Sequence, residues 1–331
     1  MTKFDFVAIG DVTTDAFIKL SEAHIEDCVK YETKELCMPW GMKVPYEGVV
    51  VVPAVGNCAN ATVAAARLGL SSALLSNVGG DKFGVEQLEA LTQNHVSIEL
   101  MRTHENMPSN YHYVLSYRGE RTILVKHEPF PYSMPDVGSP TWFYVTSLGE
   151  HSLEYHDVIV DYLLAHPDIK LAFQPGTFQM KLGTQKLERM YRRTDIFFCN
   201  VEEAQLILET KSREIKDLMN MVSELGPKIV CITDGSRGAY AFDKASGEYW
   251  FHPIYPDTKS PVDRTGAGDA FSSTFAIALA KGKTIPEALS WGPINSMSVV
   301  QYYGAQEGLL NENQIMEYLE TAPEDYKPRR L

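Results

Sequence analysis

The sequence lacks the features of membrane, secreted and disulfide-bonded proteins. No apolar run approaches the ~20 residues that a membrane-spanning helix needs. The N-terminus has neither the basic start nor the long apolar stretch and cleavage site of a signal peptide. The five cysteines are an odd number and form no C-x-x-C pair, which argues against a disulfide framework or a zinc site. We therefore expect a cytoplasmic protein with no membrane partner and with reduced, mostly buried thiols.

Positive charge is also scarce. The chain has 30 Lys+Arg against 43 Asp+Glu, which gives a formal net charge of -13. A nucleic-acid-binding surface needs Lys and Arg to displace phosphate counterions, so we expect no nucleic-acid partner. A nucleotide is not excluded, because a local nest of backbone N–H groups can hold a phosphate on an acidic protein. With 331 residues, 44% of them hydrophobic, the chain suits one large α/β domain, or one domain with a small appendage.

Two common nucleotide-binding motifs are absent. Gly282-Lys283-Thr284 resembles the end of a P-loop, but Ile277 stands where that motif requires glycine. Gly10 stands alone after the first apolar run, without the G-x-G-x-x-G fingerprint of nicotinamide-binding enzymes. These absences disfavour a P-loop enzyme and a nicotinamide-dependent dehydrogenase.

Short apolar runs alternate with segments of helical periodicity along most of the chain. This alternation is typical of βαβ units and predicts an α/β fold: a doubly wound, mostly parallel central sheet with helices on both faces. The predicted strands are Phe4–Ile9, Ala73–Val78, Phe143–Ser147, Lys170–Phe173, Asp195–Cys199 and Lys228–Thr233. The predicted helices are Ala59–Leu68, Glu86–Gln93, Leu153–Ala165, Leu182–Arg192 and Ile215–Leu225.

Two regions, over about residues 15–53 and 108–128, interrupt this alternation. The first ends in a run of four valines at 49–52, and the second alternates apolar and polar residues around a turn at Arg118-Gly119-Glu120. We expect both regions to form a small β-sheet inserted in the single α/β domain. Such a sheet can act as a lid that excludes water from a reaction, or it can be only an extension of the sheet edge.

The segment from Asp263 to Asp269 reads DRTGAGD and precedes a helical pattern of small residues over Ser272–Lys281. Glycine lets a backbone approach a ligand closely, and a helix N-terminus offers unpaired N–H groups, so we expect this loop to bind an anion. Asp269 then lies beside the anion in the first helical turn. It suits a general base for a hydroxyl that attacks a phosphoryl group, although a first-turn carboxylate can also serve only the helix.

The same segment resembles the C-terminal signature of the PfkB, or ribokinase-like, carbohydrate kinases. Further matches follow the order of that family over about residues 4–320. They are Asp11 and Asp15, Gly56-Asn57-Cys58-Ala59-Asn60, the segment Asn77–Gly84, Asn200-Val201-Glu202-Glu203 and the segment Thr233–Gly238. The resemblance implies a ribokinase-like fold with a small β lid. It also implies an ATP- and Mg²⁺-dependent kinase that phosphorylates a hydroxyl of a ribose- or fructose-like sugar.

The resemblance implies a role for each matching residue as well. Asp269 would be the catalytic base, and an anion hole would be formed by the backbone of Gly266, Ala267 and Gly268. The acceptor would contact Asp11, Asp15, Gly56, Asn57 and Asn60. The nucleotide would contact Asn200, Thr233, Gly235, Gly238 and Asn295, and Glu203 would hold Mg²⁺ through water. A monovalent cation such as K⁺ would lie at Asp263 and Thr265, with Gly304 in a later loop.

The match departs from the family around the acceptor. The stretch Phe173–Thr177 lacks the Asp and Arg of the D-x-N-x-R pattern of many family members, which leaves the substrate open. A phosphorylated acceptor would need cations, for which the candidates are Lys19, Arg118, Arg121 and Lys126. We favour a non-phosphorylated sugar, with a nucleoside as the alternative. The base of a nucleoside would need an apolar wall, for which the candidates are Phe17, Tyr111, Tyr113 and Phe130.

Two further questions stay open at the level of sequence. A catalytically silent ligand-binding or regulatory protein on the same fold is the alternative of another class, although such a protein has no physical need to keep the base, the anion site and the metal site together. Some family members form dimers through the strands of the lid and others are monomers, and an exposed sheet edge favours pairing.

Overall fold

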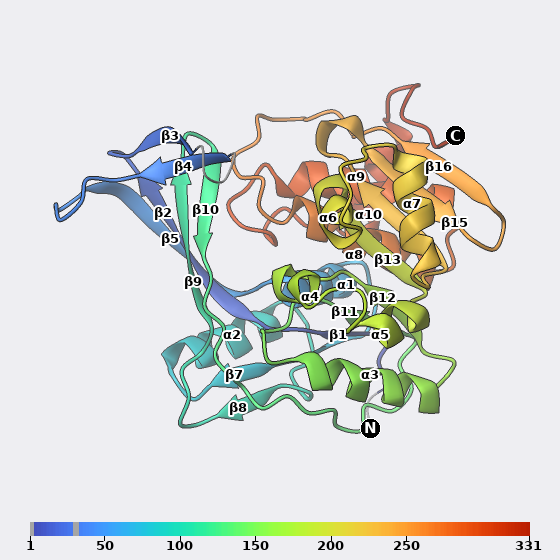
Figure 1. Cartoon of the computed structure of the whole chain (residues 1–331), viewed down its shortest axis with the longest axis horizontal. Helices are drawn as coiled ribbons and strands as arrows, with labels where there is room; N and C mark the ends of the chain where they lie inside the picture. Colours follow the sequence, from blue (N-terminus) through green and yellow to red (C-terminus); the bar gives the residue numbers. More distant parts are fainter. Residues whose placement is uncertain (1–2, 29–32) are drawn as a thin grey trace.

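The computed structural model describes residues 3–28 and 33–331, and the part of the predicted lid at 29–32 lies outside the described residues (Figure 1). Its main feature is a nine-stranded sheet. The strands in order are β17 (Arg329–Arg330), β16 (Glu248–His252), β15 (Ala239–Asp243), β14 (Ile229–Thr233), β13 (Ile196–Asn200), β12 (Lys170–Phe173), β11 (Trp142–Val145), β1 (Phe6–Ile9) and β6 (Ser72–Leu75). The strands from β14 to β6 run parallel and the other three are antiparallel. The predicted mostly parallel sheet is therefore confirmed.

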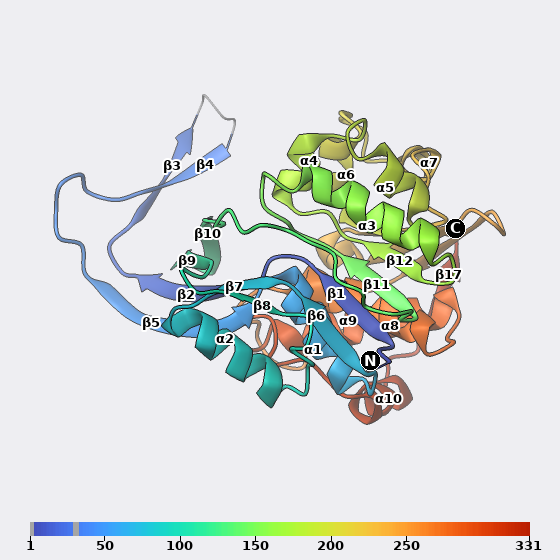
Figure 2. The same ribbon diagram turned by 90° about the horizontal axis from the view of Figure 1, so that it is seen from below.

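The central strands are apolar on both faces because helices cover both faces of the sheet. In β1, Phe6 and Ala8 belong to one hydrophobic core, whereas Val7 and Ile9 belong to the other. The first core packs against α1 (Asn57–Arg67), α8 (Ala267–Ala280), α9 (Ile285–Val299) and α10 (Glu312–Glu320). The second packs against α3 (Leu153–Ala165), α5 (Glu188–Arg193), α6 (Val201–Ile207) and α7 (Ile215–Glu224), and Figure 2 shows the two helical layers on opposite sides.

The helix expected over Leu182–Arg192 is interrupted. The structure has a short α4 (Thr177–Leu182), then turns, and then α5. Gly183 follows α4 with φ +84°, a left-handed conformation that ends a helix and that glycine adopts without strain. The break matters for the site because it leaves α4 as a separate helix of six residues, which contributes Phe178 and Lys181 to a cavity.

A separate four-stranded sheet is formed by the two interrupting regions. Its strands in order are β10 (Glu120–Leu124), β9 (Tyr111–Tyr117), β2 (Thr13–Leu20) and β5 (Tyr46–Val55). The predicted hairpin is present: Arg118 and Gly119 join β9 to β10 with φ +53° and +84°, as a two-residue turn of the type I′ class requires. We call this element the small sheet. It stands as a lobe beside the α/β body (Figure 1).

Two shorter elements complete the described part of the chain. Between β2 and β5, the strands β3 (His24–Cys28) and β4 (Thr33–Cys37) form a two-stranded sheet that projects from the lobe, away from the central sheet (Figure 2). The strands β7 (Asn77–Gly79) and β8 (Arg102–His104) pair near α2 (Lys82–Gln93). Over the residues that are described, no helix is both long enough and apolar enough to cross a membrane.

Candidate active site

A cavity of about 700 Å³ lies between the small sheet and the carboxyl ends of the parallel strands. This is where open α/β sheets bind ligands, because loops and helix N-termini converge there. The cavity gathers most of the residues predicted from the sequence. Those that line it are Asp11, Asp15, Gly56, Asn57, Asn60, Asn200, Glu203, Thr233, Thr265, Gly266, Gly268 and Asp269.

Asp269 lines this cavity from the first turn of α8. Asn57 and Asn60 of α1 each donate an amide hydrogen bond to it at 2.8 Å, to Oδ1 and Oδ2 respectively. Gln174, directly after β12, donates a third bond to Oδ1 at 3.0 Å. Burial raises the pKa of Asp269 above the ordinary aspartate value, although these three amides and the Arg121 guanidinium lower it. The carboxylate is thus fixed in orientation and is a stronger base than an exposed aspartate.

The start of α8 needs its two glycines for different reasons. Gly266 is the N-cap, with φ +79°, and a Cβ there would lie 2.2 Å from the Cβ of Ala305. Gly268 has no atom near the position of its Cβ, so packing of the chain alone does not require glycine there. Because Gly268 lines the cavity, the space beside it is open to a ligand that approaches the free N–H groups of the helix.

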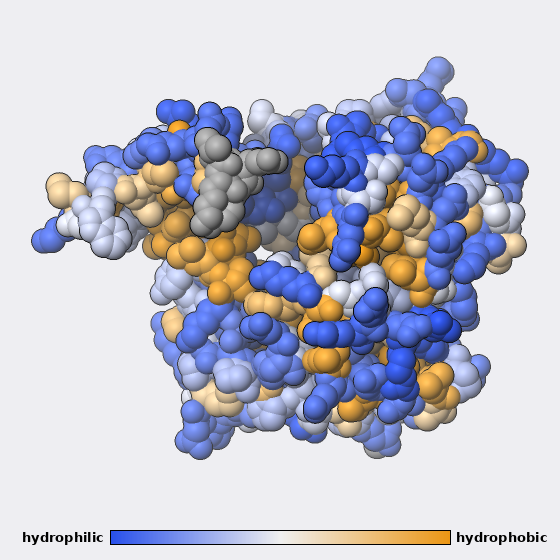
Figure 3. Space-filling model, in the orientation of Figure 1, coloured by the Kyte–Doolittle hydropathy of each residue, from blue (hydrophilic) through white to orange (hydrophobic). Residues whose placement is uncertain are grey.

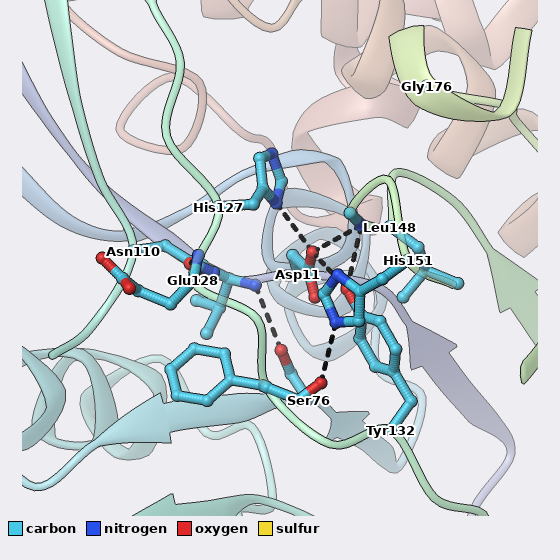
Figure 4. A network of polar contacts seen from close by, with 12 residues as sticks. Asp11, Ser76, Asn110, His127, Glu128, Tyr132, Leu148, His151 and Gly176 are labelled. Carbon is cyan, nitrogen blue, oxygen red and sulfur yellow. Dashed lines mark hydrogen bonds and ion pairs between the residues drawn. The ribbon is translucent and has the colours of Figure 1, made fainter. Parts of the chain in front are cut away.

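Asp11, in the loop after β1, is the most constrained carboxylate at the other end of the cavity. Its Oδ2 accepts three hydrogen bonds, from His127 Nδ1 at 2.7 Å, the Tyr132 hydroxyl at 2.8 Å and the Gly149 N–H at 2.8 Å. Figure 4 shows these donors converging on Asp11 from separate segments. The other oxygen, Oδ1, is buried and has no hydrogen-bond partner among the described residues. It is a ready acceptor for a hydroxyl of a ligand.

A second carboxylate–imidazole pair lies next to the first. Asp15 of β2 and His112 of β9 are register partners on adjacent strands, and His112 Nδ1 lies 3.4 Å from Asp15 Oδ1. Both Asp15 Oδ1 and His112 Nε2 are buried without a hydrogen-bond partner in the described part of the chain. The His112 and His127 rings are 5.4 Å apart, so the two pairs form one polar surface. Buried polar atoms are normally satisfied, so these atoms indicate a polar ligand.

The outer part of the cavity is less polar. Alternate residues of β10 and the segment after it, Arg121, Ile123 and Val125, face the cavity, as the two-residue period of a strand requires. Across from them, α4 contributes Phe178 and Lys181, and the Phe178 ring meets the His127 ring edge-on at 5.4 Å. A ligand held by the aspartates would extend outward between an apolar strand and an aromatic ring.

A neighbouring groove of about 280 Å³ shares Thr233, Arg264 and Gly268 with the cavity. It also contains Ala267, Gly235 and Gly238. Its apolar walls come from Ile254, Tyr255, Phe271, Pro293, Met297 and Val300. The N-terminus of α8 therefore lies where the groove and the cavity meet.

Asn200 and Glu203 form a reciprocal capping box at the start of α6. The Asn200 side chain accepts from the Glu203 N–H, and Glu203 Oε2 accepts from the Asn200 N–H, both at 2.8 Å. Both residues also line the cavity, and burial raises the pKa of Glu203, with the Asp269 carboxylate adding to this effect. A divalent cation beside Glu203 would lower that pKa again, so the residues present fit such an ion.

Asp263 organises the loop before α8. Its Oδ1 accepts from the N–H and the hydroxyl of Thr265 at 2.9 and 2.7 Å, and its Oδ2 accepts from the Gly304 N–H at 3.2 Å. Arg121 of the small sheet lies 4.0 Å from Oδ1. The carboxylate therefore links the predicted cation loop to the later loop at Gly304 and to the small sheet.

Some predicted residues lie elsewhere. Asn295 lines neither the cavity nor the groove: it is fully buried, donates to Thr274 Oγ1 and accepts from the Leu310 N–H, so it is a structural residue between α8 and α9. Of the candidate cations, Arg121 lines the cavity, whereas Lys19 pairs with Glu47 and Lys126 with Glu128. Of the candidate aromatics, Phe17 lines the cavity. Tyr111 packs on Phe83, Tyr113 is half-exposed and Phe130 is fully buried.

The sequence-based prediction missed the roles of Gln174, His112, His127, Tyr132 and Phe178. Gln174 was visible as a departure from the D-x-N-x-R pattern, but its contact with Asp269 needs the fold. The two histidines belong to a segment whose alternation was recognised, and the burial of His112 and Val114 shows which face points inward. Nothing local in the sequence marks Tyr132 or Phe178.

Comparison with known proteins gives a consistent result. The model of the pfkB family carbohydrate kinases matches residues 27–312. An uncharacterized sugar kinase of Archaeoglobus fulgidus is 27% identical over 253 residues, which cover 73% of this chain and 96% of that protein. The structure of Arabidopsis thaliana ribokinase complexed with ribose and ATP is similar with a TM-score of 0.80 and 19% identity, covering 96% of this chain and 99% of that one. The nucleoside kinase of Methanocaldococcus jannaschii has a TM-score of 0.75 and 18% identity, with coverage of 97% and 100%.

Proposed function

Because the chain belongs to the pfkB family of carbohydrate kinases, we propose that it transfers the γ-phosphate of ATP to a hydroxyl group of a ribose- or fructose-like sugar. The observation that carries this proposal is the position of Asp269. A partly buried carboxylate with a raised pKa lies at the N-terminus of a helix, where the cavity and an apolar groove meet. A base beside an anion site is the arrangement that phosphoryl transfer to a hydroxyl needs.

The acceptor would bind at the polar end of the cavity. Asp11 Oδ1, Asp15 Oδ1 and His112 Nε2 are buried and make no hydrogen bond among the described residues, so they offer hydrogen-bonding positions to sugar hydroxyls. A carboxylate accepts several O–H donors, so two aspartates can hold neighbouring hydroxyls in one orientation. Asn57 and Asn60 donate hydrogen bonds to the Asp269 carboxylate and line the same cavity, so the acceptor would be held against Asp269.

The phosphoryl group would be transferred in one displacement step. Asp269 takes the proton of the acceptor hydroxyl, and the resulting oxygen forms a bond to the γ-phosphorus. The bond from the γ-phosphorus to the bridging oxygen of ATP breaks, and ADP leaves with that electron pair. The N–H groups at Gly266, Ala267 and Gly268 would receive the charge on the transferred group, with Arg264 beside them in both the cavity and the groove.

The proposal includes two cations and a nucleotide site. The phosphates of ATP would lie along Thr233, Gly235 and Gly238. The adenine ring would lie in the groove, between the side chains of Tyr255, Phe271 and Met297. Glu203 and Asn200 would hold Mg²⁺ through water, and the ion would neutralise phosphate charge when bound. A monovalent cation such as K⁺ would be held by the loop of Asp263 and Thr265. The dependence of ADP release on added K⁺ tests this cation site.

We propose that the small sheet is the lid of this site. It supplies His112 and Arg121 to one wall, so its closure would remove the acceptor from water. In the space-filling view, apolar side chains gather on this lobe beside the hollow that separates it from the α/β body (Figure 3). The edge strand β5 exposes Val49, Val50 and Val51, and pairing of two copies along it would give a homodimer, which light scattering of the purified chain tests.

A nucleoside is the second candidate acceptor, favoured by one observation. Ile123, Val125 and Phe178 form an apolar passage directly outside the aspartate–histidine surface. A nucleobase attached to a ribose would fit between the strand and the ring, whereas a free sugar leaves this passage to water. If the acceptor is a nucleoside, a nucleobase attached to the ribose should increase kcat/KM, whereas if it is a free sugar the nucleobase should not.

The test is ADP release with ATP and Mg²⁺ against ribose, fructose, adenosine, cytidine and inosine, with the phosphorylated sugars ribose 1-phosphate and fructose 6-phosphate alongside. A single strong acceptor identifies the substrate, and preference for a nucleoside over ribose selects the second candidate. Binding of an acceptor without any ADP release, by wild-type protein that also binds ATP, would contradict the proposal and favour a silent ligand-binding protein.

A further inference from the structure

The β3–β4 hairpin carries a group of metal-ligating side chains that the kinase site does not use. His24 and Glu26 lie on β3 and Cys37 lies opposite them on β4. One ligand atom of each residue lies within 4.8 Å of the others, and His24 Nε2 is 3.1 Å from Glu26 Oε1. His24 and Cys37 lie on different strands of the hairpin and form no short Cys/His motif, which explains why the cysteine and histidine spacing predicted no zinc site.

The register of the two strands produces this grouping. His24 is paired directly with Cys37, so their side chains emerge on the same face, and Glu26 follows on that face two residues along. Glu35 is paired with Glu26, which places a further carboxylate beside the three. The backbone pairing therefore places these side chains on one face of the hairpin.

The two faces of the hairpin differ in how their cross-strand pairs are matched. On one face, Ile25 is opposite Leu36 and Asp27 is opposite Lys34, an apolar pair and an opposite-charge pair. On the other face, Glu26 is opposite Glu35, and like charges directly opposite each other destabilise a pair of strands. A cation on that face would remove the repulsion.

The hairpin also has little else to stabilise it. Among the described strands, β3 and β4 pair only with each other, and most of their side chains are exposed. An isolated two-stranded hairpin is marginally stable in water. Partial burial raises the pKa of the Cys37 thiol, and the Glu26 and Glu35 carboxylates add to the effect, so the thiol and both carboxylates share one electrostatic environment.

We propose that His24, Glu26 and Cys37 bind a divalent transition-metal ion of the Zn²⁺ class, with Glu35 beside them, and that the ion orders the hairpin. Imidazole nitrogen, thiolate sulfur and carboxylate oxygen are the donors that Zn²⁺ takes in proteins, and three protein ligands leave a position for water. Binding releases the thiol proton, so affinity rises with pH. The site lies outside the kinase cavity and is independent of the proposed function.

The test is titration of the untagged, reduced full chain with Co²⁺, a spectroscopic probe of zinc sites. We expect a near-ultraviolet thiolate-to-Co²⁺ charge-transfer absorption that saturates at one equivalent and is abolished by added Zn²⁺. Cys37→Ser should lose the absorption. His24→Ala and Glu26→Gln should each weaken Co²⁺ binding by roughly tenfold or more. Loss of a residue that only hydrogen-bonds to a metal ligand can already weaken metal binding by about that factor, and these two residues would bind the metal directly. Asp27→Asn is the matched control for Glu26→Gln, since it removes a carboxylate on the same strand but on the opposite face of the hairpin, and it should titrate like wild type.

A second measurement tests the ordering of the hairpin. Zn²⁺ should slow amide hydrogen exchange over His24–Cys28 and Thr33–Cys37 in the wild-type chain but not in His24→Ala. No charge-transfer absorption in the wild-type chain, an absorption that survives Cys37→Ser, or exchange that Zn²⁺ leaves unchanged would each overturn the proposal.

Discussion

The two walls of the cavity come from different parts of the fold and offer different chemistry. The wall from the α/β body holds Asp269 against three amides at the start of α8. The wall from the small sheet, with the segment after β10, holds His112, Arg121 and His127 around the acceptor end. The body wall would supply the proposed base and anion site, whereas the sheet wall presents polar side chains, of which His112 Nε2 has no hydrogen-bond partner among the described residues. The comparison suggests that the body wall performs the reaction and the sheet wall selects the acceptor.

The largest expected effect comes from removing the base. Asp269→Asn should lower kcat by roughly 10²–10⁴-fold, the range that general-base catalysis contributes, because an amide cannot take the hydroxyl proton. ADP release under saturating ATP and acceptor measures it. Asp217→Asn changes the same residue type in the first turn of α7, on an exposed surface, and should leave kcat unchanged. Near-normal turnover by Asp269→Asn would remove the base from the mechanism.

The two glycines of the body wall sharpen the comparison, because one serves the fold and the other serves the ligand. Gly268→Ala adds a methyl group in open space, so we expect unchanged thermal unfolding. The methyl group would keep the phosphoryl group away from the N–H donors at the start of α8, so kcat should fall by roughly 10²-fold, as when an anion-hole donor is lost. Gly266→Ala would place a Cβ against Ala305 at a position with φ +79°, a backbone conformation that alanine adopts only with strain. This change should lower the unfolding temperature and reduce the free energy of unfolding by roughly 1–3 kcal/mol. Equal loss of stability in both variants would argue against this division.

The sheet wall should affect acceptor binding more than turnover. His127→Ala removes a donor from the buried Asp11 carboxylate, and a hydrogen bond to a charged group contributes roughly 1.5 kcal/mol, so the acceptor KM should rise about tenfold. Tyr132→Phe removes another donor to the same oxygen from outside the cavity and should have a smaller effect. The measurement is steady-state kinetics with varied acceptor, and an unchanged KM with a lower kcat in His127→Ala would contradict the assignment.

The smallest effect is on pH dependence. A base works only when it is deprotonated, so kcat/KM should fall as the pH drops through the raised pKa of Asp269. Gln174→Met removes one donor that stabilises the carboxylate, which raises the pKa further. The acid limb should therefore move to higher pH by about one unit. Gln205→Met is the matched control, because the Gln205 amide lies outside the cavity and donates to the carbonyls of Lys211 and Ser212, and this change should leave the profile in place.

The same comparison explains what the sequence could and could not predict. The body wall is built at strand–helix junctions, where a few consecutive residues such as Gly266–Asp269 adopt a defined geometry, so its position and its fold were predictable. Asn200 and Glu203 were also found, although their mutual capping bonds were not. The sheet wall depends on which face of β9 turns inward and on where the segment after β10 passes, which no local pattern determines. Asn295, which only the resemblance placed near the nucleotide, is buried between helices and does not line the groove, a position that no local pattern in the sequence indicates.

The most direct test separates binding from chemistry. Calorimetric titration of the acceptor identified by ADP release, in the absence of ATP, should be carried out on wild type, Asp269→Asn and His127→Ala. We predict that Asp269→Asn binds the acceptor within a few-fold of wild type while its turnover is lost, and that His127→Ala binds about tenfold more weakly. Binding that is lost in Asp269→Asn and intact in His127→Ala would contradict the division of the cavity into a reacting wall and a selecting wall.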